Sequence, residues 1–281
     1  MTTPTKGSTS KNWSRSTSKQ RELDELLLNE SEGRVHELLS GLLKDREAHA
    51  LQSYGNVVSI RRLGFNDHGP VHARIVTYHS LRILRLLRDR DLKPSLEYEG
   101  VGTYEDAQVA VALGAFLHDV GMSVRRENHE WHSIQLSDPI IFRYLRELYG
   151  EDNPLIYAIR STVHEAIVGH MANARIHSFE AGAVLIGDGT DLARGRARIP
   201  QLMNNDPTVG DMHRYSASAV EDVQITEGDQ KPIRLTVMME NVTGLYQVEE
   251  ILMTKVKASP LMKHFEVWAI VADDEPRIYL D

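Results

Sequence analysis

The feature that most constrains the fold is an unbroken apolar run that ends in a histidine and an aspartate. Residues 109–117 read VAVALGAFL, and His118 and Asp119 follow directly. A run this hydrophobic on every side predicts a helix buried in the core, because a surface helix keeps one polar face. Gly121 stands where we expect the cap at the end of this helix. The pattern therefore places an imidazole and a carboxylate side by side at the end of a buried helix.

Two such polar groups are costly to bury unless they find partners. A cation resolves the problem, and the negative end of the helix dipole also favours one. The alternative is that both side chains hydrogen-bond to neighbouring groups, since His118-Asp119 is on its own a common dipeptide. The positions of the other histidines in the sequence distinguish these two interpretations. The chain has 13, and nine of them lie between His68 and His177, which indicates one chemically active region in the middle of the sequence.

Composition excludes several classes of protein. With 281 residues, 41% hydrophobic and 26% charged, the chain fits a globular protein with one large domain and a smaller one. It has no apolar run of membrane-spanning length and no signal-peptide pattern, so we expect no membrane association. The absence of cysteine removes disulfides and thiolate metal sites and permits a reducing compartment, and we expect a cytoplasmic protein. A net charge of −8 argues against a nucleic-acid partner.

The chain divides into four segments. Residues 1–20 are rich in Ser, Thr and Lys and predict a disordered tail. Residues 21–59 carry leucine patches at helical spacing and predict N-terminal helices, which pack on the main domain or form a homodimer surface. Residues 60–205 predict an all-helical domain. Residues 206–281 predict a small α+β subdomain with the order ββαβ, from strands at 219–226, 233–239 and 264–272, and we find no catalytic constellation in it.

Within the helical domain, polar residues mark where helices begin. Asp67 and Pro70 predict the start of a helix that continues to about residue 90, and His68 and His72 share one of its faces if the helix reaches back to His68. Thr103 opens the central helix with a capping-box pattern. Further helix starts are predicted at 138–139 and at 153–154, the second leading to about residue 170. A last apolar helix over 179–187 leads to Asp188.

The notable ligands, in chain order, are His72, His118, Asp119 and Asp188, each on or at the end of a predicted buried helix. This order resembles the HD-domain superfamily of metal-dependent phosphohydrolases, whose signature is H…HD…D on a helical bundle. His72 is followed by an aliphatic residue and valine at 75–76, and LGAFLHDVG at 113–121 is close to the family's LAALLHDIG. The final acid lies in VLIGDGTDL, where the family has an acid in a similar helix. The resemblance covers about residues 60–200 and implies a mainly α fold of the HD type.

The resemblance also implies the site. His72, His118, Asp119 and Asp188 would bind one divalent metal, and His118 and Asp119 would be catalytic. Some family members hold a second metal with further histidines. His132 and His164 match that arrangement best, with His129 and His170 as substitutes. Nitrogen and oxygen ligands suit Mn²⁺, Fe²⁺, Ni²⁺, Co²⁺, Mg²⁺ or Zn²⁺.

The sequence departs from two branches of that superfamily. Met122 stands where many phosphodiesterase-type members have a lysine. Arg125 and Arg126 stand near the place where ppGpp hydrolases have an acidic pair. Both departures argue against these particular branches.

The implied reaction is hydrolysis of a phosphoester in a nucleotide or a related small phosphorylated substrate. A bound metal lowers the pKa of a water molecule and polarises a phosphoryl oxygen. The negative charge that develops needs cations, and the candidates are Arg125, Arg126, Arg194, Arg196 and Arg198. Two alternatives stay open, a non-catalytic HD-fold protein that senses a nucleotide or regulates an assembly, and a purely structural metal. A homodimer is possible through the N-terminal helices or the small sheet.

Overall fold

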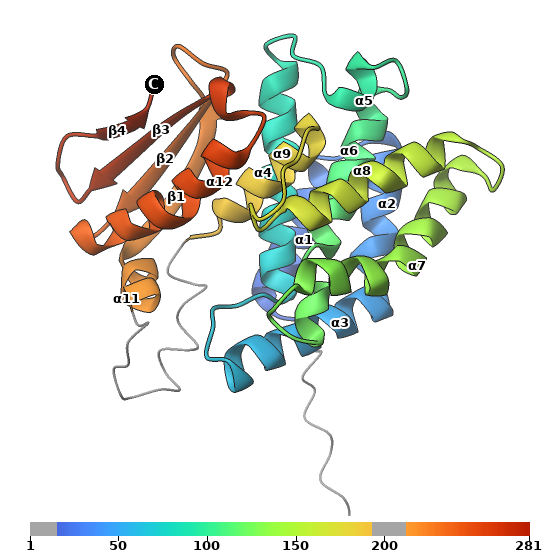
Figure 1. Cartoon of the computed structure of the whole chain (residues 1–281), viewed down its shortest axis with the longest axis horizontal. Coiled ribbons are helices and arrows are strands. Elements are labelled where there is room, and N and C mark those ends of the chain that lie inside the picture. Colours follow the sequence, from blue (N-terminus) through green and yellow to red (C-terminus); the bar gives the residue numbers. More distant parts are fainter. Residues whose placement is uncertain (1–15, 193–211) are drawn as a thin grey trace, which may run out of the picture.

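The computed structural model describes residues 16–192 and 212–281. A helical body precedes a smaller part built around a sheet (Figure 1). The body contains α1 (Ser18–Asn29), α2 (Gly33–Leu42), α3 (Arg46–Val57), η1 (Val58–Arg62), α4 (Pro70–Arg88), α5 (Ser95–Tyr98), α6 (Tyr104–Leu117), η2 (Val120–Ser123), α7 (His129–Tyr149), α8 (Leu155–Gly169) and α9 (Phe179–Gly189). The predicted class, mainly α with a small C-terminal sheet, is confirmed. Among the described residues, none of the helices has the length and apolar character needed to cross a membrane.

Helix α6 is the centre of the body. Every residue from Val109 to Leu117 is buried, as the apolar run predicts, and α2, α4, α8 and α9 all pack against this helix. Its start is fixed by the predicted capping box. The Asp106 carboxylate accepts a hydrogen bond from the Thr103 backbone N–H at 2.7 Å, and the Thr103 hydroxyl accepts one from the Asp106 N–H. The end of α6 therefore delivers His118 into the middle of the bundle.

The C-terminal subdomain, described over residues 212–281, consists of α11 (Met212–Ala219), β1 (Val220–Glu227), β2 (Ile233–Met239), η4 (Val242–Gly244), η5 (Gln247–Leu252), α12 (Met253–Ala258), η6 (Met262–His264), β3 (Phe265–Val271) and β4 (Arg277–Leu280). Its sheet has the order β1-β2-β3-β4, and only the β2–β3 pair is parallel. A parallel pair needs a crossover, and the segment containing α12 supplies it.

The ββαβ prediction for this subdomain was incomplete. The first three strands lie where the alternation of apolar residues predicts them, and β2 buries every second residue from Ile233 to Met239. The fourth strand was missed because it is a four-residue edge strand whose residues are exposed or half-buried, so it carries no apolar alternation. The helix α11 was missed as well.

Two predicted helix boundaries were wrong. Helix α1 begins at Ser18, where Thr17 and Gln20 form a capping box, so the tail predicted over 1–20 extends too far, and residues 1–15 lie outside the described part of the chain. Helix α7 begins at His129, and Pro139 lies inside it. A proline removes the hydrogen bond to the carbonyl four residues earlier. That carbonyl belongs to Gln135, and because Gln135 and Pro139 are both exposed, water can take the place of the missing donor.

The N-terminal helices pack on the body of the same chain. The leucine patches of the sequence are buried here, and they comprise Leu23, Leu27, Val35, Leu38, Leu39, Leu42 and Leu43. An ion pair between buried Arg74 and half-buried Asp24 ties α1 to α4, because the Arg74 guanidinium donates to the Asp24 carboxylate at 2.5 Å. Arg74 also donates to the carbonyl of Pro70 at 3.0 Å. These contacts hold the first turns of α4, which carries His72.

Candidate metal centre

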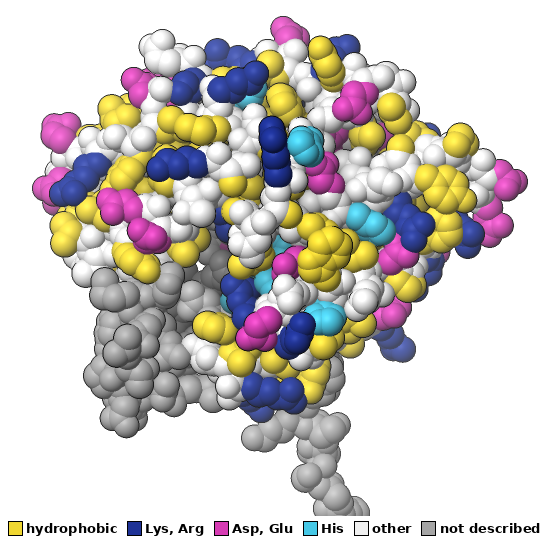
Figure 2. Space-filling model, in the orientation of Figure 1, with side chains coloured by type: hydrophobic (Ala, Val, Ile, Leu, Met, Phe, Trp, Pro, Cys, Tyr) yellow, Lys and Arg dark blue, Asp and Glu magenta, His cyan; other side chains and the backbone are white. Residues whose placement is uncertain are grey.

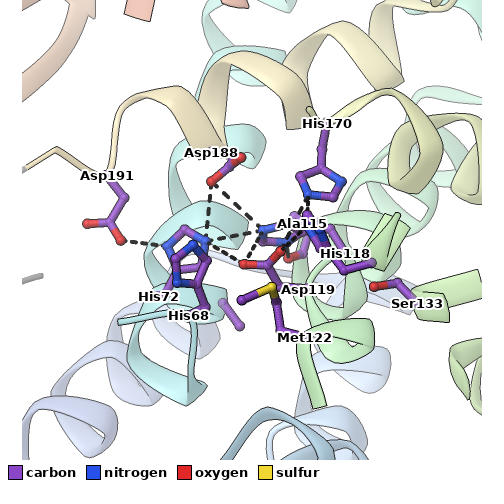
Figure 3. A network of polar contacts seen from close by, with 12 residues as sticks. His68, His72, Ala115, His118, Asp119, Met122, Ser133, His170, Asp188 and Asp191 are labelled. Carbon is purple, nitrogen blue, oxygen red and sulfur yellow. Dashed lines mark hydrogen bonds and ion pairs between the residues drawn. The ribbon is translucent and has the colours of Figure 1, made fainter. Parts of the chain in front are cut away.

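The four residues that the HD-like motif predicts as ligands meet at one point in the core (Figure 3). His72 comes from α4, His118 and Asp119 from the end of α6, and Asp188 from α9. His72 Nε2 lies 3.2 Å from both His118 Nε2 and Asp188 Oδ1. Asp119 Oδ2 lies 3.4 Å from each of the two histidine Nε2 atoms. All four side chains are at most 6% exposed.

These spacings fit a divalent ion. Ligand atoms about 2.1 Å from one ion stand about 3.0–3.4 Å from one another in octahedral or tetrahedral geometry. The Nε2 atoms of His72 and His118 lie 3.2–3.8 Å from each other and from the nearer oxygens of Asp119 and Asp188. His72, His118 and Asp119 are thus close enough to hold a metal ion together.

Hydrogen bonds fix the side of each imidazole that faces the cluster. His118 Nδ1 donates to the Ala115 carbonyl at 2.8 Å, and His72 Nδ1 donates to the Asp191 carboxylate at 2.6 Å. In a neutral imidazole this leaves Nε2 as an acceptor. The two Nε2 atoms nevertheless face each other at 3.2 Å, and two lone pairs at that distance repel unless a proton or a cation lies between them. The cluster is therefore arranged for a cation.

Asp191 is a site residue to which the sequence motif VLIGDGTDL assigned no role. It is buried, it follows Asp188 by three residues, and its carboxylate binds the back of the His72 ring (Figure 3). A carboxylate in this position orients the ring and makes the other nitrogen a better ligand. The repeated acid in VLIGDGTDL was the signal that could have identified it.

A second group of ligands uses the other oxygen of Asp119. Asp119 Oδ1 lies 3.0 Å from His129 Nε2 and 3.4 Å from His170 Nε2, and these two nitrogens are 3.0 Å apart. Their Nδ1 atoms donate to the backbone carbonyls of Arg126 and Ile167, so both Nε2 atoms face the carboxylate. Burial lowers the pKa of His170 to about 4, which keeps this ring neutral. Asp119 thus lies between two sets of histidines, each close enough for one ion.

Gly121 explains how His129 reaches this place. Sequence analysis expected Gly121 to be the cap of the central helix, but the cap is His118, and Gly121 lies in the short helix η2. A Cβ atom at Gly121 would lie 2.0 Å from the His129 carbonyl oxygen and 2.5 Å from the Ser133 nitrogen. The Gly121 N–H also donates to the Ser133 hydroxyl at 2.9 Å. The missing side chain therefore lets the first turn of α7 pack against η2, which directly follows α6.

His132 and His164, which the sequence favoured as ligands of a second metal, lie outside both groups of ligands. That prediction was wrong. The His132 ring is half-buried and bonds to Gln135 Oε1 at 3.2 Å. The His164 ring is 27% exposed and bonds to the Asp138 carboxylate at 2.9 Å. The physical reason is the position of each histidine along its helix, because that position decides whether the ring is buried. Of the four candidate histidines, only His129 at the start of α7 and His170, which caps the end of α8, are buried in the core.

His68 lies next to the cluster without belonging to α4. The helix begins at Pro70, and Asp67 does not cap it, because its carboxylate accepts from the Gly69 N–H instead. The His68 ring bonds to the Asn66 carbonyl at 2.7 Å. Its centroid lies 5.7 Å from that of His72, so the two rings are neighbours although the expected shared helix face is absent.

The predicted phosphate-binding arginines divide into two groups. Arg125 is exposed, and the Arg126 guanidinium lies over the ring of Phe65, with 5.7 Å to the ring centroid. Arg126 also approaches the sulfur of Met122 at 3.9 Å, and Met122 lies beside Asp119 in Figure 3. Arg194, Arg196 and Arg198 lie outside the described residues. Figure 2 shows histidine and acidic atoms set back near the middle of one face, next to basic and hydrophobic side chains.

The charge of the cluster is set by its two central acids. Burial tends to raise the pKa of Asp119, but the imidazole of His118, followed by those of His129 and His170, holds that pKa well below its usual range. Burial also opposes ionisation of Asp188, and the positive charge of Lys255 is the largest of the effects that hold its pKa well below the usual range. Lys255 lies on α12, so the C-terminal subdomain contributes a residue that sequence analysis missed.

Comparison with known proteins gives one relative along nearly the whole chain. The chain is 34% identical over 256 residues to the uncharacterized protein MJ1020 of Methanocaldococcus jannaschii, and the match covers 91% of this chain and 96% of that protein. The chain belongs to the same family as that protein. No family model matches the chain, and no solved structure matches it.

Proposed function

We propose that this protein is a metal-dependent phosphohydrolase of the HD type, with a nucleotide or a related small phosphorylated molecule as its substrate. One observation carries the proposal. His72, His118, Asp119 and Asp188 follow one another in the order H…HD…D, and the two histidine Nε2 atoms lie 3.2–3.8 Å from each other and from both carboxylates. Together with the resemblance of LGAFLHDVG to the motif of that superfamily, this supports a hydrolytic site better than a structural one.

The residues divide the chemical work. His72, His118 and Asp119, with Asp188 beside the two histidines, would hold one divalent ion, and Asp119, His129 and His170 would hold a second. Such ions make bound water acidic and stabilise negative charge on a phosphoryl group. Asp191 keeps His72 in the ligand orientation, and the backbone carbonyls behind His118, His129 and His170 do the same for those rings. Asp119 would orient a water molecule between the two sites, since its two oxygens reach both groups of ligands.

The rim of the site supports a nucleotide as the substrate. Phe65 is 45% exposed and carries the Arg126 guanidinium over its ring. An exposed aromatic ring offers a stacking surface to a base, and an arginine beside it offers charge to a phosphate. Arg126 contacts Met122, which lies beside Asp119, so this pair is next to the proposed metal ligands.

Metal analysis and phosphate release from a panel of nucleotides test the proposal. We expect the purified protein to carry a divalent transition metal and to release phosphate or a nucleotide product from at least one phosphoester, cyclic dinucleotides included. His118→Ala should abolish turnover and the binding of the ion that His118 shares with His72, Asp119 and Asp188, while circular dichroism shows the same helical content. His164→Ala is the matched control, because its ring lies outside the cluster, and it should behave like the wild type. Bound metal with no turnover on any phosphoester would favour a nucleotide-sensing or regulatory protein instead.

A further inference from the structure

The C-terminal subdomain reaches the metal centre through one side chain. Lys255 Nζ forms an ion pair with Asp188 Oδ2, although the two residues are 67 positions apart in the sequence. The lysine side chain is 12% exposed and the aspartate 6%, so the pair is largely withdrawn from water. Sequence analysis assigned no chemistry to this subdomain, and this contact brings a cation from it to a proposed metal ligand.

The approach of α12 to α9 is built into the sequence by two glycines. A Cβ atom at Gly189 would lie 3.0 Å from Lys255 Cδ, so the absence of a side chain leaves room for the lysine stem. A Cβ atom at Gly182 would lie 2.8 Å from the Ser259 hydroxyl, at the other end of the contact. Both glycines are in α9, the helix that carries Asp188, and α12 lies beside this helix in Figure 1. Lys255 is therefore held at the site by packing along the whole length of the contact.

The two oxygens of Asp188 face different partners. Oδ1 lies 3.2 Å from His72 Nε2 and points into the cluster, whereas Oδ2 accepts the hydrogen bond from Lys255. In the structure the lysine is the counter-charge of this carboxylate. A divalent ion held by His72, His118, Asp119 and Asp188 would bind Oδ1 and draw on the negative charge of this carboxylate, so the hydrogen bond at Oδ2 would neutralise the lysine only in part. A buried charge that is only partly neutralised is costly, so the lysine would favour an anion beside the ion.

We propose that Lys255 is a substrate-binding residue, through which the C-terminal subdomain supplies a cation to the phosphate group next to the metal centre. The inference rests on the proposed function in so far as the anion is a phosphate. A different role is conceivable, in which the lysine only holds Asp188 in place. The two roles predict opposite effects on metal affinity. Removing a nearby positive charge favours a metal ion, whereas removing a residue that orients a ligand weakens metal binding by about 10–100-fold.

The test compares the full-length wild type with Lys255→Met and Lys255→Arg. Lys257→Met is the matched control, because Lys257 is exposed on the same helix. Calorimetric titration measures the affinity of each protein for Mn²⁺ and then the affinity of the Mn²⁺-loaded protein for inorganic phosphate. We expect Lys255→Met to bind Mn²⁺ as tightly as the wild type or more tightly and to bind phosphate about 10–100-fold more weakly, the range for a lost charge-assisted hydrogen bond. Lys255→Arg should retain most of the phosphate affinity, and Lys257→Met all of it.

Several results would overturn the inference. Equal phosphate affinity in Lys255→Met and the wild type would do so, and so would a wild type that binds no phosphate when loaded with Mn²⁺. Weaker Mn²⁺ binding by Lys255→Met would make the lysine a positioning residue. If this variant fails to fold by circular dichroism, Lys255→Gln carries the same test, because its amide can still donate to Asp188. Failure of the proposed function gives a different pattern, in which the wild type binds phosphate through Lys255 but hydrolyses no phosphoester.

Discussion

The helical body contains two groups of histidine and aspartate side chains, and they are built in opposite ways. The surface trio consists of Asp138, Arg160 and His164, whose side chains are 27–31% exposed. There the Asp138 carboxylate accepts hydrogen bonds from Arg160 Nε at 2.6 Å and from His164 Nε2 at 2.9 Å. The central cluster consists of His72, His118, Asp119, His129, His170 and Asp188. Its histidines are at most 1% exposed, and their Nε2 atoms face one another.

The difference shows what makes a histidine–aspartate group a candidate for a metal. In the surface trio, the hydrogen bond from Arg160 is the largest cause that lowers the pKa of Asp138, so the carboxylate already has its cation. In the central cluster, the described ionic partners of Asp119 are imidazoles, and these present acceptor nitrogens to it. The surface trio is satisfied without an ion, whereas the central cluster needs protons or metal ions to offset the repulsion between its acceptors.

The largest expected effect comes from replacing one aspartate in each group. Asp119→Asn removes the carboxylate that faces both sets of histidines, so we expect loss of bound metal and a fall in phosphohydrolase activity of about 10³-fold or more. Asp138→Asn should leave both properties within about 2-fold, because an exposed ion pair contributes only about 1 kcal/mol or less to stability. Elemental analysis of the purified proteins and the phosphate-release assay measure both. Equal loss of metal in the two variants would contradict the distinction between the groups.

A second comparison replaces one histidine in each group. His170→Gln removes a ligand shared with Asp119 and His129, so we expect one equivalent of metal to bind at least about 100-fold more weakly while the other stays bound. His164→Gln should keep the metal content of the wild type, since its ring bonds to Asp138 alone among the described partners. Calorimetric titration of the metal-free proteins with Mn²⁺ gives the number of ions and their affinities. A wild type that binds a single ion would contradict the second site.

The positions of these histidines show which site residues could be predicted from the sequence alone and which could not. His72, His118, Asp119 and Asp188 were predictable because each ends or lies on an apolar helix, and buried helix ends have to satisfy their polar groups together. The choice between His164 and His170 was not, because it depends on which turn of α8 faces the core. One local signal was overlooked. Arg160 precedes His164 by four residues, which puts both on one helix face and supplies Asp138 with a cation.

The other residues whose roles the sequence did not reveal depend on contacts between distant parts of the chain. Nothing near Lys255 in the sequence indicates a site, because its partner Asp188 is 67 residues away and the contact depends on α12 packing against glycines of α9. Gly121 was misread for a similar reason, since its role depends on the backbone of His129 lying against it and on no local turn. The class of fold could be predicted from the periodicity of apolar residues, because burial imposes that pattern locally. Pairing between distant elements leaves no such trace in one sequence.

A smaller effect is expected from replacing Asp191. This variant distinguishes a residue that orients a metal ligand from a residue that is itself a ligand. Asp191→Asn keeps the size of the side chain but removes the charge that holds His72 Nδ1, so we expect metal affinity to fall by about 10–100-fold without loss of binding. The stoichiometry of metal per chain at saturating Mn²⁺ should stay that of the wild type. A complete loss of one equivalent would make Asp191 a ligand, and an unchanged affinity would show that His72 is oriented by other contacts.

The smallest effect concerns how the free energy of unfolding of the metal-free protein depends on pH. The central cluster and the surface trio should differ in this dependence between pH 7 and 5. Burial lowers the pKa of His170, and of His79 on α4, to about 4, so between pH 6.5 and 4 the unfolded chain takes up protons that the folded chain does not. The free energy of unfolding should therefore fall as the pH is lowered through this window, by up to about 1.4 kcal/mol per pH unit for each such histidine. Asp138 has a lowered pKa, and its contribution to the free energy of unfolding is lost only at more acidic pH, below the ordinary range of an aspartate.

Urea unfolding in EDTA at pH 7, 6 and 5 measures how the free energy of unfolding changes with pH. His170→Gln should reduce this slope, and His164→Gln should leave it unchanged. A stability that does not vary between pH 7 and 5 would mean that the imidazoles of the central cluster already share protons in the absence of an ion.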